Sequence, residues 1–115
     1  MDKQIKSGLY DILSAIREIE GYFTEEGQKQ FAHYAKDVKT KRAVERDLEI
    51  IGEAANRILQ ANPDFSLSDA RKIIDMRNRI IHGYDTVSDE IVWGVLIKHL
   101  PLLKQQVEGM LQEKR

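Results

Sequence analysis

The chain has 115 residues, of which 42% are hydrophobic and 32% charged, with a formal net charge of −1 and no cysteine. This length favours one domain over residues 1–115, and the lack of thiols excludes disulfides and thiolate metal sites. The apolar runs are far shorter than the roughly 20 residues that span a bilayer. No signal-peptide pattern opens the sequence, so we expect a soluble, cytoplasmic protein that does not enter membranes.

Helical periodicity runs through the whole sequence, whereas the alternation typical of strands is almost absent. A first helix is predicted from apolar residues spaced by three and four: Ile5, Leu9, Ile12, Leu13, Ile16, Ile19 and Phe23. After a break between Gly21 and Gly27, a short helical segment is expected near residues 31–38. A long helix follows, and it should end near Asn62-Pro63, because proline disfavours a helical conformation in its predecessor. Its stripe is Val44, Leu48, Ile51, Ala55, Ile58 and Leu59.

Two more helices are predicted in the second half. Ser66 followed by Asp69 resembles a capping box, so the third helix should start there and should end near His82-Gly83. Ser88 is expected to cap the fourth helix, and Pro101 to kink it. The fourth helix has a core stripe (Trp93, Leu96, Ile97, Leu100, Leu103, Val107, Met110) and a second apolar stripe (Ile91, Val92, Val95, Leu102). The fold class is therefore an all-α up-down bundle of four main helices, and a second subunit is one candidate to cover the second stripe.

Arg77 stands inside the apolar stripe of the third helix, which contains Ile73, Ile74, Met76, Ile80 and Ile81. A guanidinium there needs a partner, because an unpaired buried charge is costly. One interpretation is a structural ion pair with Glu49 or Glu53. Another is that the aliphatic stem packs while the charged head reaches water. His82 lies about 140° from Arg77 on a regular helix, so the two side chains would converge only if the helix ended early or a second subunit supplied its own copies.

The charges are unevenly distributed along the chain. Residues 36–46 hold five basic and two acidic side chains, and residues 71–79 hold four basic and one acidic. These stretches are either ordinary solvated helix faces or a surface for a phosphate backbone. The three histidines show no metal-ligand spacing, and no phosphate loop or nucleophile elbow occurs. We therefore expect neither a metal site nor a cofactor.

The octet Arg77–Tyr84, RNRIIHGY, reads R-x4-H-x-Y. It resembles the signature of the HEPN superfamily, and specifically of its HepT-like ribonuclease toxins. The stretch LEIIGEAA (residues 48–55) resembles the family's second-helix segment, and Met76, residues 91–93 and Leu100-Pro101 also fit. The resemblance extends over roughly residues 1–110.

The resemblance implies a helical-bundle homodimer that cuts RNA without a metal in a cleft between the subunits, with transfer RNA and messenger RNA as candidate substrates. It implies that Arg77 and His82 are the catalytic pair, with Asn78 and Glu53 in supporting positions. Histidine suits proton transfer near neutral pH, and arginine supplies a fixed positive charge for the phosphorane. Basic side chains flanking the cleft would hold the RNA backbone: Lys39, Lys41, Arg42, Arg46 and Arg79.

The family also implies a partner. An MntA-type nucleotidyltransferase antitoxin is expected to silence the toxin by attaching AMP to Tyr84, and the two proteins can form a larger hetero-oligomer. A bulky anion two residues from His82 would block the cleft and repel RNA. Two rival hypotheses remain: a non-enzymatic HEPN module that docks a nucleotidyltransferase, with Arg77 in a structural ion pair, and a nucleotide-binding domain that uses the same basic cleft.

Overall fold

The computed structural model describes residues 2–24, 30–67, 69–82 and 88–112, and all regular structure within these ranges is helical. The elements are α1 (Lys3–Gly21), α2 (Phe31–Lys36), α3 (Val38–Ala61), α4 (Ala70–His82), α5 (Asp89–Gly94), the π-helical segment η1 (Val95–His99) and α6 (Leu100–Gln112). The predicted all-α bundle is thus confirmed, with α5, η1 and α6 forming the fourth main helix. None of the described helices is long and apolar enough to cross a membrane.

Local capping explains where the helices begin. The Asp2 carboxylate accepts hydrogen bonds from the backbone N–H of Gln4 (2.6 Å) and Ile5 (3.4 Å) at the start of α1. Asp37 alone separates α2 from α3, and its side chain accepts from the Thr40 backbone N–H. Ser88 accepts from the Ile91 N–H at 3.1 Å, as predicted for the cap of the fourth helix. The predicted end of the long helix before Asn62-Pro63 is also confirmed.

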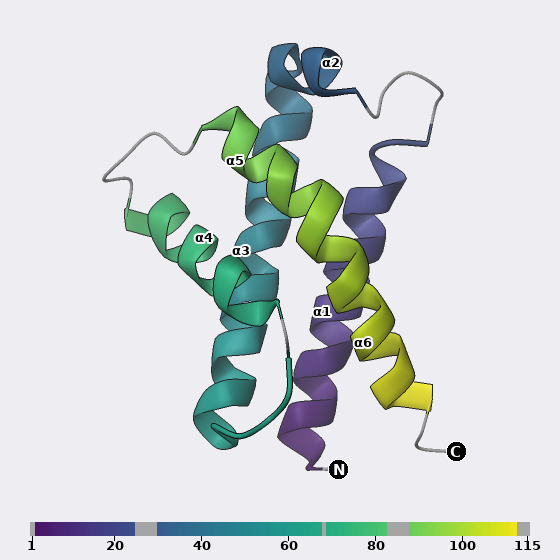
Figure 1. The fold of residues 1–115 in the computed structure, drawn as a ribbon, viewed down its shortest axis with the longest axis vertical. Helices are drawn as coiled ribbons and strands as arrows, with labels where there is room; N and C mark the ends of the chain where they lie inside the picture. Colours follow the sequence, from purple (N-terminus) through teal and green to yellow (C-terminus); the bar gives the residue numbers. More distant parts are fainter. Residues whose placement is uncertain (1, 25–29, 68, 83–87, 113–115) are drawn as a thin grey trace.

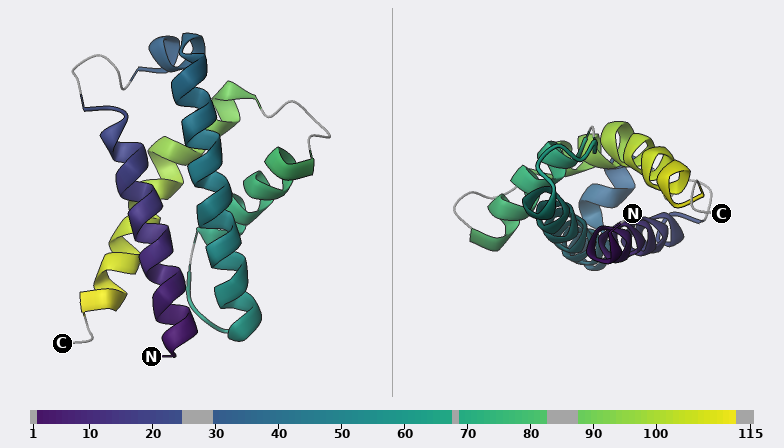
Figure 2. Two further views of the ribbon diagram at one scale, coloured as in Figure 1. Left: turned by 180° about the vertical axis from the view of Figure 1, so that it is seen from behind. Right: turned by 90° about the horizontal axis from the view of Figure 1, so that it is seen from below.

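The helices pack in two layers around one core. In Figure 1, α1 and α3 lie side by side and antiparallel, α4 packs against α3, and the path of α5, η1 and α6 crosses obliquely in front. The view from below in Figure 2 places α1 and α3 on one side of the molecule and α6 on the other. The core between them is aliphatic, and its fully buried members include Leu9, Ile12, Leu48, Ile51, Ile73 and Leu103.

The start of the third helix was predicted too early. α4 begins at Ala70, and Asp69 does not complete a capping box with Ser66. Its Oδ1 instead lies 2.7 Å from His99 Nδ1. This partner is 30 residues away in the chain, so local sequence could not reveal it. The predicted stop at His82 agrees with the end of α4, while Gly83 lies outside the described residues.

The apolar stripes of the third and fourth helices are only partly buried. Ile81 (49% exposed) and Ile97 (43% exposed) were predicted in core stripes and lie at the surface, whereas Val92 and Val95 from the second stripe are buried. The π-helical turn before Pro101 accounts for the change on the fourth helix. There the Leu100 N–H donates to the Val95 carbonyl, five residues back, which shifts the register of the buried face. The kink predicted at Pro101 stays a prediction, and the irregularity that the structure shows is this π-helical segment, which ends at His99.

Candidate active site

Arg77 lies where α4 crosses α3. A Cβ atom placed on Gly52 of α3 would lie 2.5 Å from Arg77 Cβ and 3.1 Å from Arg77 Cγ, so the stem of Arg77 packs directly on the α3 backbone. The side chain is half-buried, and its Nε has no solvent exposure and no hydrogen-bond partner in the described part of the chain. Its Nη1 donates to Asn78 Oδ1 at 2.7 Å. Of the two interpretations of Arg77, this arrangement favours the one in which the aliphatic stem packs against the neighbouring helix.

The ion-pair interpretation of Arg77 finds no counterpart in the described residues. Among these residues, neither Glu49 nor Glu53 forms an ion pair with Arg77, and Glu53 is exposed on α3. The positive charge of Arg77 is therefore not cancelled by a neighbouring carboxylate in the described structure. The supporting role of Glu53 stays a prediction, whereas Asn78 does contact Arg77.

His82 is the last residue of α4, and its side chain is exposed. Because the helix continues through His82, an ideal α-helix places it about 140° around the axis and about 7.5 Å along it from Arg77. One chain therefore directs the two side chains to different sides of α4. Tyr84, predicted as the modification site, lies outside the described residues.

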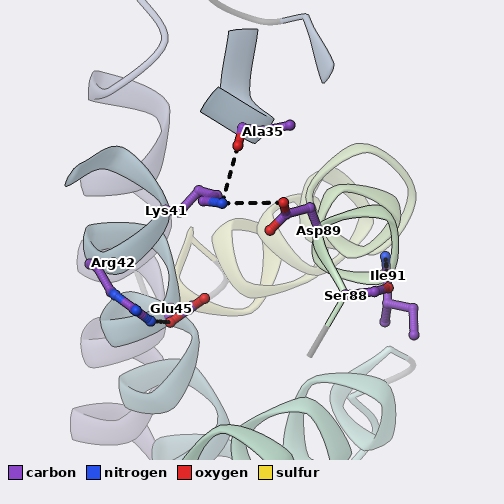
Figure 3. Close-up of polar contacts among 7 residues, drawn as sticks. All are labelled: Ala35, Lys41, Arg42, Glu45, Ser88, Asp89 and Ile91. Carbon is purple, nitrogen blue, oxygen red and sulfur yellow. Dashed lines mark hydrogen bonds and ion pairs between the residues drawn. The ribbon is translucent and has the colours of Figure 1, made fainter. Parts of the chain in front are cut away.

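The predicted RNA-binding residues fall into two groups. Lys39, Arg46 and Arg79 are exposed, and Arg42 is exposed while its Nη1 lies 3.2 Å from Glu45 Oε1. Lys41 differs, because its Nζ donates to the Ala35 carbonyl (3.1 Å) and to Asp89 Oδ2 (3.2 Å). Figure 3 shows this Lys41 contact joining α2, α3 and the start of α5. Lys41 thus has a structural role in the described chain, while the other four remain accessible to a phosphate backbone.

A shallow groove runs between α4 and the helix formed by α5 and η1, and its lining is Lys72, Asp75, Met76, Arg79, Ile91 and Val95. It combines apolar surface with two cations and one carboxylate that lie on the same helix as Arg77. A better enclosed pocket lies elsewhere, between α1 and the fourth helix, and is mainly apolar, with Glu20 as the charged residue in its lining. Because both Glu20 carboxylate oxygens accept from Lys104 Nζ, that pocket offers little for phosphate chemistry. In the described ranges, no group of three His, Cys, Asp or Glu side chains is arranged to hold a metal ion.

Sequence reasoning missed one buried polar contact. Asp47 of α3 is only 2% exposed, and its Oδ2 accepts the Tyr22 hydroxyl at 2.7 Å. Burial is the main reason why the pKa of Asp47 rises to about 6, and the nearby Glu18 adds to the rise. Burial and Asp47 also raise the pKa of Tyr22 to about 12. The available signal was an acid three residues after Val44 and four before Ile51, inside the apolar stripe of α3.

Comparison with known proteins identifies the family of this all-helical chain. The family model described as "Ribonuclease HepT-like" matches residues 12–110, and the chain belongs to this HEPN-type family. It is 34% identical to the "Probable ribonuclease HepT" of Thermococcus cleftensis, over 96% of this chain and 98% of that protein.

Two further relatives carry the name "Putative RNase". One, from Caldanaerobacter subterraneus, is 35% identical over 74% of this chain and 77% of its own length. The other, from Methanocaldococcus jannaschii, is 28% identical over 96% of this chain and 90% of its own length. No solved structure matches the chain. Family and relatives together indicate a ribonuclease, and therefore an RNA substrate.

Proposed function

We propose that this protein is a metal-independent endoribonuclease toxin in which Arg77 and His82 act on a phosphodiester. The 2′-hydroxyl of the RNA attacks the adjacent phosphorus, the bond to the 5′-oxygen breaks, and a 2′,3′-cyclic phosphate remains. A histidine takes the proton from the 2′-hydroxyl, and a second acid protonates the departing 5′-oxygen. The observation that supports this most is the Arg77 guanidinium, held by Asn78 on α4 with no carboxylate paired to it in the described chain. Such a charge is available for the phosphorane.

In this proposal the protein acts as a homodimer, and helix geometry supports that arrangement. An ideal α-helix places Arg77 and His82 on different sides of α4, which favours two chains, rather than one, supplying the groups at one phosphate. Two copies placed side by side provide two histidines, one as base and one as acid, with an arginine beside them. The apolar side chains of Ile81 on α4 and Ile91 on α5 are 49% and 45% exposed near this region, and a second subunit would cover them.

RNA would be held by the exposed cations. Lys39, Arg42 and Arg46 lie on the N-terminal half of α3, and Arg79 lies on α4 in the shallow groove. These cations form a local positive surface on a chain whose net charge is −1, so they do not reflect an overall positive charge. Affinity should therefore fall with salt as these few phosphate contacts are screened.

In this proposal, modification of Tyr84 switches off the ribonuclease activity. An MntA-type nucleotidyltransferase would transfer AMP from ATP to the tyrosine hydroxyl, releasing pyrophosphate and placing an anion two residues from His82. In this proposal the transferase is the antitoxin and the ribonuclease is the toxin of one system in the cytoplasm.

The deciding experiment mixes transfer RNA with purified protein, confirmed as unmodified by intact mass, in excess EDTA. His82→Ala is the test variant, and His33→Ala, an exposed histidine on α2, is its matched control. Cleavage by wild type and His33→Ala but not by His82→Ala, with cyclic phosphate ends, is the expected result. Equal cleavage by His82→Ala would overturn the mechanism. No cleavage by any of the three proteins would favour the docking-module hypothesis, in which the chain serves a transferase.

A further inference from the structure

Gly52 lies at a close contact between α3 and α4. A Cβ atom at this position would lie 2.5 Å from Arg77 Cβ and 3.0 Å from the Ile73 carbonyl oxygen. Real Cβ contacts are essentially never below 3.0 Å, and these two neighbours are the Cβ of one α4 residue and the backbone carbonyl of another, not the far end of a flexible side chain. Any larger residue at position 52 must therefore move α4 or Arg77 itself.

The glycine is costly to its own helix. Glycine inside a helix is destabilising by about 1 kcal/mol relative to alanine, and Gly52 lies well within the 24 residues of α3. No unusual backbone conformation requires glycine here, since its φ lies outside the left-handed region. What position 52 requires is space, and the atoms that occupy this space are those of Arg77.

We propose that Gly52 is a positioning residue for Arg77. Because Gly52 has no side chain, the Arg77 stem lies against the α3 backbone, which buries Nε and leaves Nη1 on Asn78 Oδ1. The guanidinium is thus fixed at its base by Gly52 and at its tip by Asn78 before RNA binds, which reduces the ordering needed at the reacting phosphate. This inference rests on the catalytic role proposed above for Arg77.

Gly52→Ala is the test. An ordinary contact of 3.4 Å or more requires the new Cβ and Arg77 Cβ to separate by about 1 Å more than the present geometry allows. A misplacement of that size at a catalytic group lowers kcat by up to about 100-fold. Arg77 is assigned to the transition state, so kcat should fall while KM changes little.

Gly8→Ala is the matched control. A Cβ at Gly8 of α1 would lie 2.9 Å from Ile58 Cδ1 and Cγ1, which are side-chain atoms rather than the backbone of a neighbouring helix. It perturbs the packing of α3 on its other side without touching α4. We expect Gly8→Ala to keep kcat within about twofold of wild type, assayed well below its own Tm.

A double-mutant cycle separates positioning from general damage. Under single-turnover conditions, Gly52→Ala should lower the rate in the wild-type background but not further in an Arg77→Ala background, because the misplaced group is then absent. The same loss in both backgrounds would overturn the proposal, and so would a wild-type kcat for Gly52→Ala. If Arg77→Ala itself cleaves RNA like wild type, the catalytic role of Arg77 fails instead.

A second readout does not depend on the variants folding. In the wild-type protein, nuclear Overhauser contacts should connect the Gly52 α-protons with the Arg77 β-protons, and the buried Arg77 Nε–H should exchange slowly with water. Absence of that contact, or fast exchange of the Nε–H, would overturn the proposal without any substitution.

Discussion

On the side of α3 that meets α1, Gly8 faces Ile58, and the neighbouring side chains are buried and aliphatic. On the side that meets α4, Gly52 faces Arg77, which is half-buried and charged. Both contacts bring two helices close together through a glycine. The first packs against the outer atoms of an isoleucine side chain, while the second packs against Cβ of an arginine and a backbone carbonyl. Thus α3 has one face that stabilises the core against α1 and another face that positions the charge of Arg77.

Because the two faces of α3 differ in this way, stability and activity should respond to different substitutions. The α1 face contributes buried apolar area, and its loss should lower the free energy of unfolding. The α4 face contributes the location of a guanidinium, and its loss should lower the rate per folded molecule. Substitutions that change both properties together would break this comparison.

Ile12→Ala should have the largest effect on stability. Ile12 of α1 is fully buried, and truncating a buried isoleucine lowers the free energy of unfolding by about 2–5 kcal/mol. Urea unfolding at 25 °C measures this change, with the exposed Ser14→Ala as control, expected within about 0.5 kcal/mol of wild type. RNA cleavage per folded molecule should stay unchanged. A fall in rate for folded Ile12→Ala would mean that the two faces are not separate.

Arg77→Ala should show the opposite pattern. Removing a donor to a developing negative charge costs about 100- to 1,000-fold in kcat. Because Arg77 forms no ion pair with a carboxylate among the described residues, its removal there leaves no carboxylate without a cation. We expect the free energy of unfolding to fall by only about 1 kcal/mol, from lost packing of the stem on Gly52. Arg71→Ala, an exposed arginine on the same helix, is the control for charge alone. A loss of about 3–5 kcal/mol would instead support the structural ion-pair hypothesis.

How far the sequence predicts this molecule depends on whether the signal is local. The Ser88 cap and the stop at Asn62-Pro63 involve neighbouring residues, and both are confirmed. The predicted start of α4 was wrong, because it relied on Asp69 as a local capping residue, whereas Asp69 contacts His99, which is distant in the chain. The surface position of Ile97 depends on a π-helical turn that a regular wheel does not contain.

The candidate site follows the same rule. The R-x4-H spacing located Arg77 and His82, but the sequence left the partner of Arg77 open between Glu49, Glu53 and water. The structure identifies Asn78, the next residue in the chain, as a hydrogen-bond partner. It also identifies Gly52 beneath the stem, for which a lone glycine inside a helical pattern was the only signal.

Lys41→Met should have an intermediate effect and sharpen the assignment of the basic residues. Lys41 is 21% exposed at its side chain, and its loss leaves Asp89 and the Ala35 carbonyl without their shared donor. We expect the free energy of unfolding to fall by about 1–2 kcal/mol. Arg42→Met, whose side chain is 77% exposed, should stay within about 0.5 kcal/mol but raise the KM for RNA. The reverse outcome, with a raised KM and unchanged stability for Lys41→Met, would return Lys41 to the RNA-binding surface.

Asp47 is the exception on the otherwise aliphatic side of α3 that meets α1. Asp47→Asn should have the smallest effect on stability, visible only as a change in how the free energy of unfolding depends on pH. Burial and Glu18 raise the pKa of Asp47 from 3.8 to about 6, while the Tyr22 hydroxyl and Arg46 act in the opposite direction. Between pH 4 and 6 the folded state therefore keeps a proton that the unfolded state has released. Because the folded state binds more protons in this window, its stability falls as pH rises through it.

Asparagine at position 47 removes this titration and still accepts the Tyr22 hydroxyl through Oδ1. The stability of Asp47→Asn relative to wild type should therefore increase from pH 4 to 6 and then level off. Urea unfolding of both proteins at matched pH and ionic strength measures the difference, so carboxylates with lowered pKa, such as Asp37, cancel. A difference that does not change with pH would mean that Asp47 is ionised in the folded protein across this range. The face toward α1 would then contain a buried charge, and the contrast with the Arg77 face would lose its chemical basis.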